Sequence, residues 1–199
     1  MKRATPETIR LWGGALCLDF VNTVDRAQDG GHVAPELTDV LVAPELLPRW
    51  GARVGVVDPG AEPVAGQAEL ERVRALREAL HDAFAAIAGD DAPDPSGLAV
   101  LSASHAEAVA AGELAPAGGV WRYDWAADDP RRVRFAAALD AVALLGDADR
   151  LARVTRCPGR HCGWLFINAS GRRRWCSMST CGSREKMRRA YRRRRDART

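Results

Sequence analysis

Four cysteines near the C-terminus have the spacing of a metal site. Cys157, Cys162, Cys176 and Cys181 follow the pattern C-x4-C-x13-C-x4-C. Two close pairs, separated by a segment of hairpin length, can place four thiolates around one tetrahedral zinc ion. Four thiolates leave no open position for water, so the expected zinc is structural and not catalytic. A module of about 45 residues buries too little apolar surface to fold alone, and zinc would supply the missing stability.

Cysteine chemistry also depends on the cellular compartment. The N-terminus lacks the apolar core of a signal peptide, and no run of residues approaches the length of a membrane span, so we expect a cytoplasmic protein that does not bind membranes. Paired cysteines in a reducing compartment indicate metal ligands or a thiol–disulfide switch that releases zinc. The fifth cysteine, Cys17, lies alone in an apolar run and is expected to be a buried spectator.

Arginine dominates the segments around the last cysteine pair. A run of three arginines precedes Cys176, and the segment 183–195 would form a helix covered with arginine. So many like charges repel each other in water, and a polyanion would relieve that repulsion. Arginine forms forked hydrogen bonds with phosphate and with guanine, so we expect nucleic-acid binding. The candidate contacts are Arg172, Arg173, Arg174, Arg184, Arg188, Arg189, Arg192, Arg193 and Arg195.

Charge divides the chain into two parts. Residues 150–199 contain 16 Lys and Arg against two acids, whereas residues 1–149 carry a net charge of −11. Such asymmetry is typical of a basic polyanion-binding module joined to an acidic body. The sequence therefore predicts an N-terminal domain over residues 1–149, for ligand sensing or assembly, and a zinc module over residues 150–199.

Hydrophobic periodicity predicts a mainly α fold, with a helical N-terminal domain that contains one small β-hairpin. The clearest helix covers 67–88, and the hairpin covers 113–125 around Gly118-Gly119. Ser96 would cap a helix that ends near residue 111, and Asp129-Pro130 would start another. Further helices are expected near 16–24 and 44–53.

The zinc module is expected to resemble a treble clef or zinc ribbon. Strands at 164–167 and 172–176 would pair around a turn, and the basic helix would follow, capped by Thr180 or Ser183. That helix would pack on the module through its apolar edge, which includes Met187 and Tyr191.

The N-terminal part contains no recognisable catalytic constellation. We find no nucleophile–base pair and no phosphate-binding glycine loop, so we expect no enzymatic activity. Asp19 and Asn22 are the polar pair that could line a ligand pocket, because they lie within an apolar segment. The alternative is that they hydrogen-bond the backbone of neighbouring loops.

Two motifs resemble a known family. The C-terminal motif comprises the cysteine pairs with their neighbours in CGWLF, RWCSM and CGSR, and it resembles the CGNR zinc finger. The N-terminal motif begins at residue 16 with LCLDFVNT and looks like the opening of the ABATE domain. The resemblance implies a stress-induced bacterial transcription regulator whose N-terminal domain senses a ligand. Ser183 stands where the family signature has Asn. Both residues cap helices well, but a base contact made by Asn would be altered here.

Together these features predict a zinc-dependent regulator that binds duplex DNA, with a small-molecule effector and a homodimer as further expectations. Two alternatives stay open: an RNA- or ribosome-binding protein, and a zinc-thiolate redox sensor that acts through a protein partner.

Overall fold

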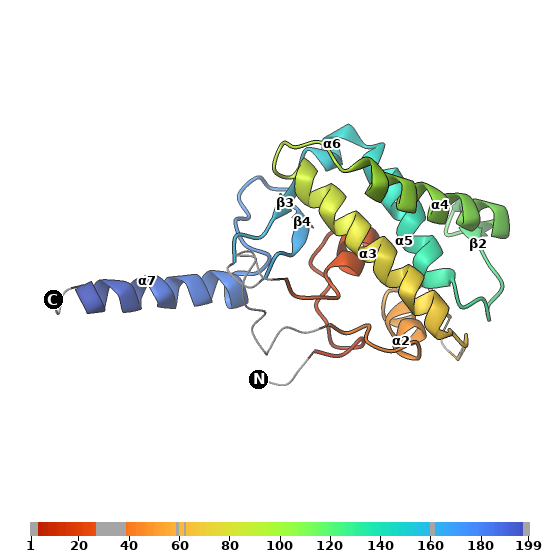
Figure 1. Cartoon of the computed structure of the whole chain (residues 1–199), viewed down its shortest axis with the longest axis horizontal. Helices are drawn as coiled ribbons and strands as arrows, with labels where there is room; N and C mark the ends of the chain where they lie inside the picture. The colour runs from red at the N-terminus through yellow and green to blue at the C-terminus, as the bar shows by residue number, and fades with distance from the viewer. Residues whose placement is uncertain (1–3, 27–38, 59, 62, 160–161, 197–199) are drawn as a thin grey trace.

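The fold is a bundle of helices that carries a small cysteine-rich module at one end (Figure 1). The computed structural model describes residues 4–26, 39–58, 60–61, 63–159 and 162–196. Among the helices of these residues, none has the length and apolar composition of a membrane span. The elements are α1 (Leu16–Val21), α2 (Leu46–Arg53), α3 (Gln67–Ile87), α4 (Pro95–Ala111), β1 (Glu113–Ala117), β2 (Val120–Asp124), α5 (Arg132–Leu145), α6 (Ala148–Leu151), β3 (Val154–Arg156), β4 (Leu165–Ile167), the π-helical turn η1 (Met178–Gly182) and α7 (Ser183–Asp196).

The long helix α3 supplies the centre of the core. Its apolar stripe was predicted from spacings of three and four residues, and Leu70, Val73, Leu76, Leu80 and Phe84 are each at most 1% exposed. Helices α1, α4 and α5 pack against α3, and α5 also contacts α2 and α6. The helical body expected from the sequence is therefore confirmed.

A buried ion-pair network joins the helices on the α4 side of α3. The guanidinium of Arg134, which is 1% exposed, donates to Glu69 of α3 at 2.8 Å and to Glu107 of α4 at 2.9 Å. One guanidinium contacts both carboxylates, so the buried charge of Arg134 is paired and hydrogen-bonded. The network fixes α5 against both neighbouring helices.

Two predicted helix starts are wrong by a few residues. Asp94, and not Ser96, caps α4: its carboxylate accepts the backbone N–H of Ser96, and Pro95 occupies the first turn. Asp129 accepts the N–H of Arg131 in a turn, and α5 begins only at Arg132. Asp129 and Pro130 thus lie in the turn that precedes α5 and not in its first helical turn.

The hairpin of β1 and β2 is confirmed, with both glycines of its turn at positive φ. Its aromatic residues divide between core and surface. Trp125 is 9% exposed and packs on Phe135, whereas Trp121 is 69% exposed. Trp125 also donates its indole N–H to the carbonyl of Ala108, so the strand end is tied to α4.

The hairpin of the cysteine module is not the predicted one. Strand β4 pairs antiparallel with β3, which precedes the first cysteine pair, whereas residues 172–176 form no strand. The reason is that β4 and β3 are the two arms of one turn that contains Cys157 and Cys162. Val154 and Leu165 belong to the main apolar core, so the core continues past residue 149 into the module. The domain boundary at that residue stays a prediction.

Helix α7 projects away from the helical body (Figure 1). None of its residues, all of which the structure describes, is buried. Met187 and Tyr191 are 64% and 69% exposed, so the expected packing of this apolar edge on the module is wrong. At its root the helix contacts η1.

Candidate zinc centre and nucleic-acid interface

The first cysteine pair lies in a tight turn between β3 and β4. Cys157 donates its backbone N–H to the carbonyl of Trp164 at 2.8 Å, and Cys162 donates to Gly159 at 3.1 Å. Gly163 has φ +66°, and a Cβ there would lie 2.9 Å from the Cβ of Arg26. Glycine is therefore required at Gly163 both by the backbone and by the close approach of the N-terminal part.

The second pair comes from a loop and a π-helical turn. Ser177 caps this turn by accepting the N–H of Ser179, and Cys181 lies within it. The prediction that Ser183 or Thr180 caps the helix is wrong, because Ser183 already lies inside the continuous helix. Its hydroxyl donates to the carbonyls of Ser179 and Thr180 at 2.9 and 3.0 Å.

All four cysteine side chains converge on one point. Their sulfur atoms lie within 4.8 Å of one another, and all four residues are buried. Zn–S bonds of about 2.3 Å in a tetrahedron separate the sulfur atoms by roughly 3.8 Å. The Sγ of Cys176 lies 3.5 Å from those of Cys162 and Cys181, which matches this spacing. Cys157, Cys162, Cys176 and Cys181 therefore fit one zinc ion with four thiolate ligands.

The thiols shift one another's pKa in opposite directions. Hydrogen bonds from neighbouring thiols, Cys162 first, hold the pKa of Cys157 well below its usual range. The hydrogen bond with Cys157 instead raises the pKa of Cys162 far above its usual range. Four thiolate charges cannot share this space without a cation, and zinc supplies that charge when it displaces the thiol protons.

The N-terminal part holds the zinc turn directly. The side-chain amide of Asn22 pairs with the backbone N–H and carbonyl of Leu165, and Arg26 donates its backbone N–H to the carbonyl of Cys162 at 3.0 Å. His81 of α3 donates to the carbonyl of Gly163 at 3.3 Å. Trp12 packs edge-on against Trp164, with ring centroids 5.9 Å apart. The zinc turn is therefore built onto the helical body.

Asp19 and Asn22 are placed by these contacts as parts of the backbone framework. Asn22 is 1% exposed, and its amide is used at Leu165. Asp19 accepts the backbone N–H of Gly13 at 2.8 Å. Burial raises the pKa of Asp19 to about 6, with a further contribution from the charge of Asp140. Both side chains thus hydrogen-bond the backbone of other segments, which was the alternative to a ligand pocket. A ligand pocket at Asp19 and Asn22 stays a prediction.

Arg173 holds the loop before Cys176. Its guanidinium lies 4.1 Å from the ring centroid of Phe166 and donates to the carbonyls of Trp175 and Cys176. Burial lowers the pKa of this guanidinium, and the neighbouring Cys176 opposes the shift. Arg173 is thus engaged inside the module, unlike the exposed Arg172 and Arg174 on either side.

Helix α7 carries the other predicted arginines on an open surface. Arg184, Arg189, Arg192, Arg193 and Arg195 are exposed, and Arg188 is half-buried. Glu185 forms ion pairs with Arg188 and with Arg189, the latter at 2.9 Å. This one acid therefore neutralises part of the positive charge on the first turns of α7. The remaining positive charge lies along a helix whose root is fixed next to Cys181.

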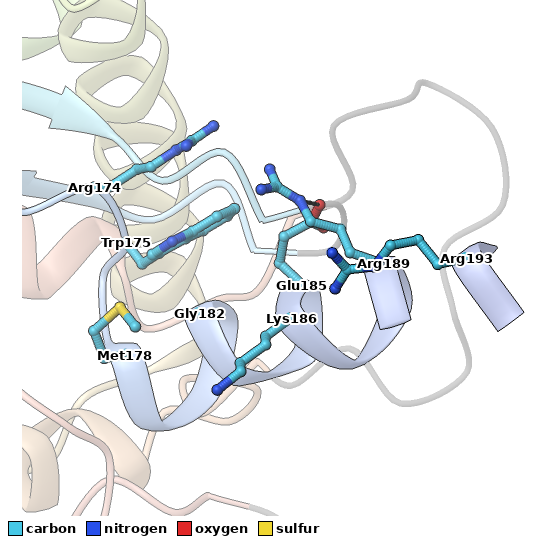
Figure 2. A pocket seen from close by; sticks show the side chains of 8 residues that line it. All are labelled: Arg174, Trp175, Met178, Gly182, Glu185, Lys186, Arg189 and Arg193. Carbon is cyan, nitrogen blue, oxygen red and sulfur yellow. Dashed lines mark hydrogen bonds and ion pairs between the residues drawn. The ribbon is translucent and has the colours of Figure 1, made fainter. Parts of the chain in front are cut away.

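Sequence reasoning did not identify the residues that surround the root of α7. Trp175, Met178 and Lys186 join the predicted arginines in lining a pocket there (Figure 2). Trp175 directly precedes Cys176, within the segment that was expected to form a strand, and Met178 follows Cys176 by two residues. The signal that could have found them is their position, since both lie within two residues of Cys176 and both precede the basic helix.

The fold and the site define a helical protein with a C-terminal four-cysteine zinc finger. Residues 14–148 match the family model ABATE, whose description reads "Putative stress-induced transcription regulator", and residues 153–194 match the CGNR zinc finger. Because the first match covers more than half of the chain, the protein belongs to the ABATE family. A comparison with curated proteins finds no significant match. The predicted architecture and its single zinc site are confirmed by both family matches and by the cysteine cluster.

Proposed function

We propose that the protein is a bacterial transcription regulator that binds duplex DNA through α7 and the loop that precedes Cys176. The observation that carries this proposal is the placement of an exposed arginine helix directly after a zinc ligand. A zinc centre fixes the direction in which a helix leaves a small module, and recognition helices are presented in this way to the major groove. The family description as a regulator supports the same assignment.

Phosphate contacts would supply most of the affinity. If about six arginines neutralise phosphates, the logarithm of the association constant should fall with the logarithm of salt concentration at a slope of roughly −5. Base edges would be read by the arginines that face the groove, because the guanidinium matches guanine O6 and N7. Arg173 would act differently from the rest, since its guanidinium is engaged with Trp175 and Cys176.

The helical part of the chain is assigned by this proposal to ligand sensing or assembly, in the cytoplasm, without enzymatic activity. Four thiolate ligands would leave the zinc no position for a reacting water, which supports a structural metal. The contacts of Asn22, Arg26 and His81 with the zinc turn would carry a change in the body to the finger.

The test is a selection from a random duplex-DNA pool by the zinc-loaded full chain, with excess transfer RNA as competitor. An enriched motif would establish sequence-specific DNA binding, and an inverted repeat would indicate a homodimer. Absence of any enriched motif, with the RNA displacing the DNA, would contradict the proposal and favour RNA binding.

A further inference from the structure

A pocket of about 310 Å³ lies where the loop before Cys176 meets the root of α7 (Figure 2). This volume is at the lower end of the range for pockets that bind small organic groups. The lining combines an aromatic ring, a thioether and several cations. The lining residues are Arg174, Trp175, Met178, Gly182, Glu185, Lys186, Arg189 and Arg193.

Trp175 forms the aromatic wall of this pocket. Figure 2 shows its ring between Arg174 and Met178, extending toward the first turns of α7. The guanidinium of Arg174 lies 5.4 Å from the ring centroid, and Met178 is 70% exposed. Gly182 leaves room for both side chains, because a Cβ there would lie 2.8 Å from the sulfur of Met178 and 3.2 Å from the Cδ1 of Trp175. An apolar, partly exposed surface thus lies within the most basic region of the chain.

Charge around the pocket favours an anion. Four of the lining residues are cations, and Glu185 is the one acid among them. That carboxylate is already paired with Arg188 and Arg189, and the hydrogen bond from Arg189 lowers its pKa. Arg174, Lys186 and Arg193 are therefore left to attract a phosphate group.

We infer that this pocket takes the base of one unpaired nucleotide of a DNA strand, with its phosphates held by the surrounding cations. This inference rests on the proposed DNA binding and adds a second mode of contact to it. In a regular duplex only base edges are accessible, whereas a base that has left the stack offers its whole face to an aromatic ring. Trp175 provides that ring, and the arginine row of α7 remains available for the adjoining duplex.

The experiment compares three labelled DNA hairpins of one sequence: a perfect duplex, the same duplex with one bulged adenine, and the bulge made abasic. The zinc-loaded full chain should bind the bulged adenine about tenfold more tightly than the perfect duplex, as expected for one base stacked on an aromatic ring. The abasic bulge should lose this preference. A 2-aminopurine placed in the bulge should lose fluorescence on binding, because stacking on Trp175 quenches it.

Two pairs of variants test the role of the pocket. Trp175→Leu should abolish the preference while Trp175→Phe retains it, with zinc stoichiometry checked for both. Arg193→Gln should weaken binding of the bulged DNA more than of the duplex, whereas the adjacent Arg192→Gln, outside the pocket lining, should weaken both equally.

Equal affinity of the unaltered protein for bulged and perfect DNA, or unquenched 2-aminopurine, would overturn the inference. So would a Trp175→Leu protein that keeps the preference. Failure to bind any of the three DNAs would overturn the proposed function, and the inference that rests on it would fail as well.

Discussion

The side chain of Asn22 completes the edge of β4 as a backbone segment would. Its Nδ2 donates to the carbonyl of Leu165 at 2.8 Å, and its Oδ1 accepts the N–H of Leu165 at 2.9 Å. Two residues further along β4, Ile167 donates its N–H to the carbonyl of Gly13. Strand β4 therefore pairs with β3 on one edge and with the start of the chain on the other.

The first prediction concerns this amide. Asn22→Ala leaves a buried N–H and a buried carbonyl of Leu165 without partners, which should cost roughly 3 kcal/mol of unfolding free energy. Because the same strand leads out of the zinc turn, zinc should also be lost to a competing chelator at lower concentration. Chemical denaturation and chelator titration measure the two effects. Asp94→Ala, which removes a remote helix cap, should cost about 1 kcal/mol and leave the chelator titration unchanged; equal zinc retention by both variants would contradict the coupling.

The second prediction is that zinc removal loosens the helical body as well as the finger. Val154 and Leu165 lie in the main core, so the loss of the zinc turn should expose their neighbours in α1. Cys176→Ser, or chelation, should lower the melting temperature and speed amide exchange in β3, β4 and α1. Cys17→Ala, which changes a buried cysteine outside the cluster, should keep one zinc per chain. Unchanged exchange in α1 after zinc loss would show that the two parts are independent.

The third prediction follows from Asp19. Its folded pKa of about 6 lies above the unfolded value near 3.9, so the charged carboxylate is disfavoured in the fold. Stability should therefore fall as pH rises from about 4 to 6, and the cost should be complete above pH 6. Asp19→Asn keeps an oxygen to accept from Gly13 and should gain about 3 kcal/mol at pH 7.5. The difference in unfolding free energy between variant and unaltered protein, measured from pH 4 to 8, should grow up to about pH 6; a constant difference would disprove the assignment.

The fourth prediction separates binding from stability in α7. Arg184→Gln with Arg192→Gln should flatten the salt dependence of DNA binding by about 0.9 in slope per lost phosphate contact. The melting temperature should hardly change, because both side chains are exposed. Arg122→Gln on the exposed strand β2 makes the same change in charge as either single substitution and should leave the slope unaltered. An equal effect of Arg122→Gln would indicate attraction by net charge alone.

Local patterns predicted much of the fold and of the zinc site. The apolar stripe of α3 and the spacing within each cysteine pair involve residues only a few positions apart. The helix and the cysteine cluster that they predicted are both confirmed. Strand β3 was missed because its three residues, Val154–Arg156, are too few to show alternation. Residues 172–176 were chosen instead as the partner of β4, although Arg173 there folds back over Phe166.

Long-range contacts are what the sequence could not reveal. Asn22 and Leu165 are separated by 143 positions, and nothing in either segment identifies the other as its partner. The exposure of Met187 and Tyr191 was missed for a related reason, since helical spacing shows that they share a face but not whether that face is covered. The pocket beside Trp175 likewise depends on how the π-helical turn directs α7.

The solvent-surrounded position of α7 has an evolutionary consequence. A helix without buried residues contributes little of the packing that selection for folding must preserve. Substitutions along it can accumulate without the loss of stability that limits change in α3 or α5. A lineage could therefore acquire new targets by altering this one helix, while the zinc turn and the helical body keep their form.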